Sequence, residues 1–393
     1  IVEFVADVTW AQALVDVIKT EHNSDGTHAS AIVLTSPVIN TGISGDAVLD
    51  EDDMASDSDT KVATQQSVKA YVDSRSNFNI YENSIINGGC EVAQRSAPNL
   101  STSYQYGQVD RFAVKADGTV GAGTVIQTTS PLVTSATAKA IKVSGVTLTG
   151  LGALYLRYRM ESRDATKLKN LATSFSLNVY HDQGSAVNYT ITVNKANAVD
   201  DFSAVTQIAT SGNLSVNNET STEIKLENIN SGNLGDCSNG LEIIVKINCG
   251  AVTNKNFEFS NIQLNKGATV GDFQPKFYSD ELLSCRRYYI RYLASGNYDI
   301  FPGSIQTTAK SYVNYNLPVQ MRIAPTLSSS TITGSAFTIV RSDAVANVSA
   351  MTLSAGNRPD GGSIAVDMAS STAGQACFLR MADGNWLAFS AEL

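Results

Sequence analysis

Apolar and polar residues alternate with a period of two along most of the chain beyond residue 77. The alternating runs are short and are separated by Gly, Asn and Ser, which is typical of half-buried β-strands joined by turns. Examples are residues 175–180, 189–193 and 241–247. Because no helical pattern interrupts this stretch, we predict an antiparallel jelly-roll β-sandwich over residues 77–280.

Two short helical patterns precede the sandwich, in residues 1–76. In the first, Thr9 and Gln12 form a capping-box pair, followed by apolar residues at helical spacing. The second is predicted over residues 60–74, with Asp59 or Thr60 as its cap. Helices this small cannot bury their own apolar residues, so partner copies of the chain are expected to cover them.

A trimer is the expected assembly, because amides such as that of Gln65 can bond one another around an axis and set register. We therefore predict that residues 1–76 form a shaft and trimerisation segment of an elongated homotrimer. The predicted interface residues are Trp10, Leu14, Val62, Gln65, Lys69 and Val72.

The last part of the chain, residues 281–393, is predicted to be a connector helix and a distal β-domain. Residues 280–291 have Leu282, Cys285 and Tyr289 spaced for one helical face. Ser- and Thr-rich strand patterns follow at residues 326–340, and the run 386–389 is expected to close a sheet. The fold class is therefore mostly β.

Charge excludes two classes of partner. The chain of 393 residues has a net charge of −9, and only 17% of its residues are charged, against roughly 25% in ordinary soluble domains. Binding a phosphate backbone requires clustered Lys and Arg, so we expect no nucleic-acid partner. Anionic membranes are disfavoured for the same reason, and no apolar run is long enough for membrane insertion.

Cysteine spacing and the acidic residues predict no metal site. Five cysteines lack zinc-site spacing and are expected to be free, buried thiols, although Cys237 and Cys249 could pair across a hairpin. Residues 46–59 are rich in Asp and Glu without a base. Calcium binding is the alternative for this segment, but the central Gly and terminal Glu of a calcium loop are missing, which favours a solvated linker.

Four segments resemble bacteriophage tail fibre or receptor-binding proteins. Residues 39–75 look like a shaft-to-head segment, and NGGCEVAQRS at 87–96, with Asp110-Arg111-Phe112, is similar to the opening of the head sandwich. Residues 257–292 resemble its closing strand and exit helix, apart from Asn265-Lys266 where a Glu is usual, and QACFLRMADGNWLAFSAEL matches more loosely.

The resemblance implies a homotrimeric adhesin in the tail fibre of the virion, extracellular when it acts. It further implies a carbohydrate-module-like jelly roll and a distal β-domain that meets host surface glycans or another host receptor. Other virion tail proteins would attach through the N-terminal side. Because the chain begins at Ile1 without a Met, we expect a further portion upstream.

Catalytic chemistry is not predicted. Acids occur only as scattered residues, the chain has three histidines, and no convincing Ser-His-Asp set or carboxylate pair emerges. Gly121 and Gly123 lack the rest of a nucleotide-binding fingerprint, so no cofactor is expected. Two alternatives to an adhesin stay open: a structural fibre spacer that carries a separate tip protein, and a polysaccharide depolymerase.

Two groups of residues are candidates for ligand binding. Sugar recognition uses exposed aromatic faces and polar side chains on loops of a rigid scaffold. Tyr104 and Tyr106 lie close to a turn in a polar stretch. Asn357, Arg358 and Asp360 belong to a turn-forming loop of the distal domain, and this loop has the best polar side chains for a glycan contact.

Overall fold

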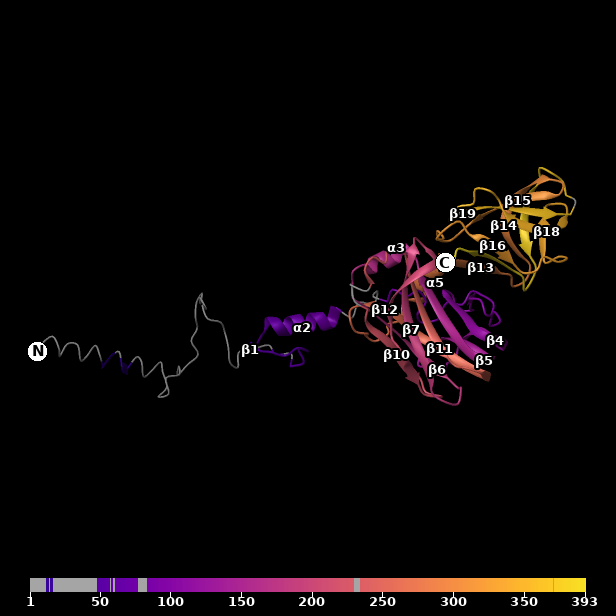
Figure 1. Cartoon of the computed structure of the whole chain (residues 1–393). Coiled ribbons are helices and arrows are strands. Elements are labelled where there is room, and N and C mark those ends of the chain that lie inside the picture. Colours follow the sequence, from indigo (N-terminus) through magenta and orange to yellow (C-terminus); the bar gives the residue numbers. More distant parts are fainter. Residues whose placement is uncertain are drawn as a thin grey trace, which may run out of the picture. The chain divides into compact units, whose positions relative to one another are not determined.

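The computed structural model describes residues 12–13, 15–16, 48–56, 58, 61–76, 83–229, 234–369 and 371–393. Strands greatly outnumber helices, which confirms the predicted mostly-β class (Figure 1). The chain divides into two compact units, Ile1–Arg75 and Ser76–Leu393. Within the described part of the chain, none of the helices combines the length and the apolar character needed to cross a membrane.

The first unit contains a short parallel strand pair and a helix. Strand β1 (Val48–Leu49) pairs with β2 (Val62–Ala63), and α2 (Gln65–Ser76) follows. Thr64 caps the helix, since its Oγ1 accepts a hydrogen bond of 3.0 Å from the Ser67 backbone N–H. Asp50 from the acidic segment joins this cap, accepting bonds from the Thr64 and Ser67 hydroxyls at 2.5 and 2.9 Å.

The predicted start of this helix is wrong. It begins at Gln65 and not at residue 60, because Val62 pairs with Val48 as a strand and Thr64, rather than Asp59 or Thr60, provides the cap. Strand pairing with a distant residue outweighs the local helical pattern. Gln65, Lys69 and Val72 are exposed on α2.

The first predicted helix lies mostly outside the described residues, as do Trp10 and Leu14. Gln12, Ala13, Val15 and Asp16 are helical, and the Gln12 side-chain amide donates to the Asp16 carboxylate at 3.0 Å. The predicted trimer and its elongated shape stay predictions.

An antiparallel β-sandwich forms the first part of the second unit, as predicted. Its strands follow the path β10-β6-β12-β5-β11-β7-β8, with β3, β4 and β9 paired beside it. The bounds are β3 Gln105–Tyr106, β4 Phe112–Thr128, β5 Ala140–Met160, β6 Thr173–His181, β7 Val187–Ala198, β8 Asp201–Thr210, β9 Leu214–Val216, β10 Thr222–Ile229, β11 Leu241–Asn248 and β12 Val252–Lys266. A short helix, α3 (Ser162–Ala165), and a 3-10 turn, η1 (Thr166–Leu168), follow β5.

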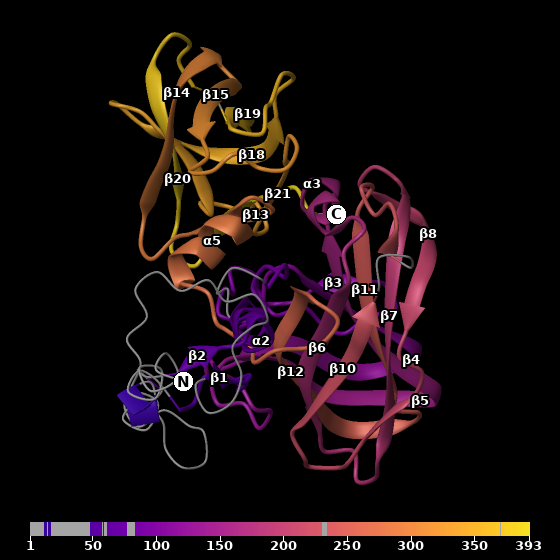
Figure 2. The ribbon, with the colours of Figure 1, turned by 90° about the vertical axis from the view of Figure 1, so that its left-hand side faces the viewer.

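Strand β5 belongs to both layers of the sandwich (Figure 2). Its first half, from Ile141 to Leu148, pairs with β12, and its second half, from Leu154 to Met160, pairs with β11. Between the halves, Leu151 is fully exposed. Apolar side chains from strands of both halves form a single hydrophobic core. Strands such as β7 and β11 alternate between core and outward-facing residues, whereas β6 is buried along nearly its whole length.

The C-terminal part holds a second hydrophobic core and a closed six-stranded barrel of order β14-β15-β19-β18-β17-β20. Beside the barrel, a three-stranded sheet has the order β13-β21-β16, and helix α5 (Tyr278–Arg286) precedes both. The bounds are β13 Tyr289–Leu293, β14 Tyr298–Thr307, β15 Lys310–Asn316, β16 Thr326–Ser329, β17 Phe337–Val340, β18 Val345–Leu353, β19 Gly361–Met368, β20 Ala376–Met381 and β21 Trp386–Ser390.

Two predictions for this part need correction. The helix predicted over 280–291 ends at Arg286, because Tyr289–Leu293 pairs antiparallel with Trp386–Ser390. The run 386–389 does not close its sheet but is the central strand, paired on both sides. Both differences arise from pairing between segments about a hundred residues apart, which no local pattern contains.

All five cysteines are free and buried, as predicted. Cys237 and Cys249 are not paired, and the Cys237 thiol instead donates to the Ala165 carbonyl at 3.1 Å. Burial raises the pKa of Cys249 to about 11, so that thiol stays protonated at neutral pH. No group of three His, Cys, Asp or Glu side chains that could hold a metal ion occurs among the residues that the structure describes.

Candidate functional site

The loop between β18 and β19 is held by backbone hydrogen bonds on both sides. Arg358 and Gly361 exchange two of them, at 3.0 and 3.3 Å, around a turn with Pro359 and Asp360 at its centre. Proline fixes the backbone angle that the second position of such a turn needs. The Leu317 and Met321 amides also donate to the Asp360 and Pro359 carbonyls, at 3.0 and 2.8 Å. The turn is therefore a rigid part of the barrel.

A cavity of about 330 Å³ lies between this loop and the neighbouring strand β15. Asn314 and Asn316 of β15 stand opposite Ser363 and Gly361 of β19, and both asparagines are exposed. The polar side chains that line the cavity are Asn314, Asn316, Asn357, Arg358, Asp360 and Ser363. Ligand cavities of proteins usually have mostly apolar linings, so this one is suited to a polar ligand.

The two charged residues of the cavity hold each other only weakly. Arg358 Nε is 3.9 Å from Asp360 Oδ1, and the side chains are 79% and 65% exposed. An exposed ion pair of this length contributes less than about 1 kcal/mol to stability. Both side chains can therefore turn toward a ligand at little cost.

Two buried polar atoms meet beside Gly362 without a protein partner. Asn357 Oδ1 and Tyr315 Oη have no hydrogen bond to any described residue, and Tyr315 is only 1% exposed. A Cβ atom at Gly362 would lie 2.2 Å from Asn357 Oδ1 and 3.2 Å from Tyr315 Oη. Buried polar atoms almost always have a partner. Of these two residues only Asn357 lines the cavity, so its Oδ1 is an acceptor that a hydrogen-bond donor of a ligand would satisfy, whereas Tyr315 belongs to the core of the barrel.

The structure brings the three candidates of the loop, Asn357, Arg358 and Asp360, to the same cavity. Sequence reasoning missed Asn314, Asn316 and Ser363, which reach the cavity through the pairing of β15 with β19. The alternation of exposed asparagines with buried residues in β15 is the signal that could have identified the first two.

Tyr104 and Tyr106 do not join this cavity, because they lie on the sandwich. The Tyr104 side chain is half-buried and packs against the Arg157 guanidinium, which lies 3.8 Å from the centre of the Tyr104 ring. The Tyr106 hydroxyl donates to the backbone oxygen of Leu393 at 3.0 Å. Burial raises the pKa of each phenol to about 12, so both are protonated at neutral pH.

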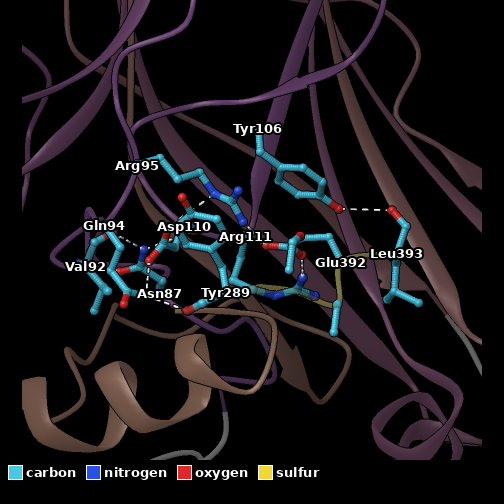
Figure 3. Close-up of polar contacts among 12 residues, drawn as sticks. Asn87, Val92, Gln94, Arg95, Tyr106, Asp110, Arg111, Tyr289, Glu392 and Leu393 are labelled. Carbon is cyan, nitrogen blue, oxygen red and sulfur yellow. Dashed lines mark hydrogen bonds and ion pairs between the residues drawn. The ribbon is translucent and has the colours of Figure 1, made fainter. Parts of the chain in front are cut away.

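The sequence motifs at 87–96 and 110–112 form a buried polar network that holds the C-terminus (Figure 3). Glu392 accepts hydrogen bonds from Arg95, at 2.6 Å, and from Arg111. The Arg95 and Arg111 guanidiniums also lie over the rings of Tyr289 and Tyr288, at 3.6 and 3.4 Å. These contacts join the sandwich to the chain end.

Asp110 and Asn87 complete the network. Asp110 lies 3.3 Å from Arg95 Nε and accepts a bond of 2.7 Å from Gln94, whose amide also donates to the Tyr289 carbonyl at 2.9 Å. The Asn87 amide donates to the Val92 and Asp110 carbonyls at 2.9 and 3.0 Å. Burial raises the pKa of Asp110 to about 7, and Arg95 opposes this shift. These motif residues are engaged with one another and serve the structure.

Comparison with known proteins identifies no family: no family description and no curated protein matches the sequence. Several solved structures are similar. One is a carbohydrate-binding module of the β-sandwich superfamily with promiscuous specificity, at 15% identity and a TM-score of 0.31. The match covers 42% of this chain and 63% of that chain, so it spans less than two thirds of the other's length.

Two further similar structures are also sugar-binding modules. TmCBM61, solved with β-1,4-galactotriose, has 13% identity and a TM-score of 0.30, covering 47% of this chain and 99% of its own. The C-terminal family 22 module of Xyn10B from Clostridium thermocellum has 12% identity and a TM-score of 0.27, and the match covers 43% of this chain and 96% of that module. Scores this low carry no argument about the function of this chain, which must be made from its own residues.

Proposed function

We propose that this protein is an adhesion protein that binds surface glycans through the cavity between the β18–β19 loop and β15. One observation carries the proposal, namely a cavity of about 330 Å³ whose lining offers amides, a hydroxyl, a guanidinium and a carboxylate together.

A sugar presents neighbouring hydroxyl groups, each of which both donates and accepts hydrogen bonds. The asparagine amides of the cavity can do both, Asp360 can accept two bonds, and Arg358 can only donate. This combination complements a pair of adjacent hydroxyls. An apolar ligand would leave the same groups without partners, at a cost of roughly 1–3 kcal/mol each.

The rigidity of the loop supports the same proposal. The backbone bonds of the Pro359–Asp360 turn and the β15–β19 ladder fix the cavity before a ligand arrives. A ligand then binds without the conformational entropy loss of ordering a loop. Weak, polar ligands such as sugars benefit most from a site that is ordered in advance.

We further propose that the adhesion protein is a trimeric subunit of a bacteriophage tail fibre that acts without catalysis and joins other virion tail proteins through its N-terminal side. The support is the resemblance of the four sequence segments, together with the apolar side chains of α2. Val68 and Val72 on this helix are 45% and 54% exposed in the single chain, and packing against other copies would bury them.

Glycan-array binding tests the proposed adhesion. The double variant Arg358→Ala/Asp360→Ala should reduce the affinity for the bound glycan about tenfold or more, because it removes charge-assisted hydrogen bonds. The matched control is Arg380→Ala/Asp299→Ala, which removes another ion pair of the same barrel, at 2.6 Å, outside the cavity lining. Unchanged binding in the cavity variant, or an equal loss in the control, would reject the cavity as the contact.

Analytical ultracentrifugation at micromolar concentration tests the proposed assembly. We expect the full chain to sediment as a trimer, because the exposed valines of α2 need partner copies. A monomer under these conditions would contradict the fibre proposal. It would not affect the proposal of a glycan-binding cavity, which the glycan array tests separately.

A further inference from the structure

Basic and aromatic side chains gather on the outward face of one sandwich layer, formed by β4, β5 and β11. Along β5, Leu154, Leu156 and Tyr158 point into the core, so Tyr155 and Arg157 point outward between them. We call the following five partly exposed residues the basic face: Tyr104, Lys115, Tyr155, Arg157 and Lys246.

Strand register places two lysines on either side of one ring. Tyr155 pairs with Lys115 of β4 and with Lys246 of β11. The Lys115 and Lys246 ammonium groups lie 4.5 and 5.8 Å from the centre of the Tyr155 ring. Lys115 is also 5.3 Å from the ring of Tyr104, which stacks on Arg157. Three cations and two rings thus form one continuous surface.

Acidic groups neutralise this surface only in part. Asp117 pairs with Lys115 at 3.2 Å and accepts the Tyr155 hydroxyl at 2.5 Å. Glu242 bonds mainly to Arg159, at 2.8 Å, and is 3.9 Å from Arg157. Arg159 in turn also donates to the Leu393 backbone oxygen at 3.2 Å.

Lys246 therefore keeps most of its charge available, whereas the Arg157 side chain is only 11% exposed and packs against the Tyr104 ring. Lys246 has no ion pair with any residue that the structure describes, and the only one of Arg157 is the long contact to Glu242. Burial, and to a lesser extent the neighbouring Arg159, lowers the pKa of Arg157. The whole chain has a net charge of −9, so a surface where cations outnumber acidic groups differs in sign from the protein as a whole.

Hydroxyl groups extend the surface across the next strand. On β7, Thr190 stands opposite Lys246, and Thr192 stands opposite Ile244, the residue between Glu242 and Lys246 on the outward side of β11. Neighbouring strands lie about 4.8 Å apart, so the row from Lys115 to Thr190 spans roughly 14 Å over four strands. The surface is thus long enough for an extended chain ligand and offers it rings, cations and hydroxyls in sequence.

We propose that the basic face binds an acidic polysaccharide, with uronic-acid carboxylates held by Lys115 and Lys246, sugar rings resting on the tyrosines, and Arg157 holding the Tyr104 ring in place. Charge complementarity selects the carboxylates, and the threonine hydroxyls bond to sugar hydroxyls. A nucleic acid fits poorly, because its dense phosphates require many more cations than this face contains. The proposal does not rest on the barrel cavity, and it adds a second, charge-selective contact to the molecule.

Affinity electrophoresis of the full chain in low salt, with polygalacturonate as probe, tests this proposal. The neutral control ligand is the fully methyl-esterified form of the same polymer, which differs only in its carboxylates. We expect the wild-type protein to bind polygalacturonate, to bind the ester at least tenfold more weakly, and to lose affinity as salt is added.

Variants locate the binding. Lys115→Gln/Lys246→Gln should reduce the affinity for polygalacturonate about tenfold, and Lys246→Gln alone should reduce it severalfold while leaving every described ion pair intact. The control Lys225→Gln alters a lysine on β10, which pairs with Glu227 at 3.5 Å on the other layer, and should bind as the wild type does.

Several results would overturn the proposal: no wild-type binding in low salt, equal binding of the ester, or full binding by both basic-face variants. Equal affinity for inorganic polyphosphate would also overturn it, since charge alone would then explain the binding. The variant Arg358→Ala/Asp360→Ala should still bind polygalacturonate. A loss of binding in that variant would assign the acidic polymer to the barrel cavity instead, so the two sites are tested separately.

Discussion

The network around the C-terminus and the cavity of the barrel use the same kinds of side chain in opposite ways. In the network, Arg111 is 1% exposed and bonds to Glu392 and to the Arg159 carbonyl. In the cavity, Arg358 is 79% exposed and makes only a 3.9 Å contact with Asp360. Both regions contain Arg, Asp and Asn, as Figure 3 shows for the network. Residue type alone therefore does not separate a structural polar group from one that is available to a ligand.

Burial and partners make the distinction. A buried charge must be paired within the protein, so the network side chains are committed to one another. The cavity side chains keep donors and acceptors that the described residues do not use, including Asn357 Oδ1. The network also has an atom without a hydrogen bond, Arg111 Nε, but it belongs to a side chain that is only 1% exposed. This difference predicts that substitutions in the network change stability, whereas substitutions in the cavity change binding.

The largest expected effect is on the network arginine. Arg111→Ala should lower the free energy of unfolding by about 3–5 kcal/mol, because Glu392 would stay buried with a partner lost. The same substitution at Arg358 should change it by less than about 0.5 kcal/mol. Denaturant unfolding followed by circular dichroism measures both. Similar losses of unfolding free energy in the two variants would contradict the distinction between the buried network and the exposed cavity.

The next effect is a loss of stability with rising pH, caused by Asp110 of the network. Burial raises the pKa of Asp110 from 3.8 to about 7, so between these values the folded state holds a proton that the unfolded state has released. This contribution to stability is therefore complete below pH 3.8 and is lost as pH rises through 7, by on the order of 4 kcal/mol.

The variant Asp110→Asn cannot release that proton. It should lack this part of the pH dependence, so the stability difference between wild type and variant should shift in favour of the variant as pH rises from 4 to 8. Denaturant unfolding at a series of pH values measures this. A difference that is constant with pH would show that Asp110 titrates at its ordinary pKa.

A smaller effect on stability is expected at Gly362. A Cβ atom there would lie 2.2 Å from Asn357 Oδ1, so Gly362→Ala should displace the Asn357 side chain and lower glycan affinity about tenfold. Stability should fall by only about 1 kcal/mol, because the displaced atom is the end of a side chain. Gly271→Ala, where the added carbon meets nothing within 4 Å, is the matched control and should change neither property. A large stability loss with normal binding would contradict the assignment of the cavity.

Local patterns predicted what depends on neighbouring residues. The period-two alternation correctly indicated strands such as β7 and β11, since alternation follows directly from a strand with one buried face. Turn chemistry identified the loop with Pro359, because proline and aspartate favour a turn whatever surrounds them. The two errors in helix bounds, at residues 60–64 and 287–291, occur where a helix-like pattern meets a strand from elsewhere in the chain.

The candidate site was also predictable only where its residues are close together in the sequence. Asn357, Arg358 and Asp360 are close in sequence and could be found together, whereas Asn314 and Ser363 share the cavity only because β15 pairs with β19. Tyr104 and Tyr106 are two residues apart, yet one lies on the basic face and the other bonds to the chain end. Tyr104 precedes β3 and Tyr106 belongs to it, and their different surroundings come from partners in distant segments, Arg157 and Leu393.

By itself the sequence determined the β class, the free cysteines and the polar turn of the barrel, because these follow from local alternation, spacing and turn propensity. Only the tertiary structure decided which polar residues are buried and paired, as in the network of Arg95, Asp110 and Arg111, and which face a cavity. The physical reason is that burial and pairing are properties of contacts between distant segments. The free energy of a charged side chain depends on those contacts far more than on its neighbours in the chain.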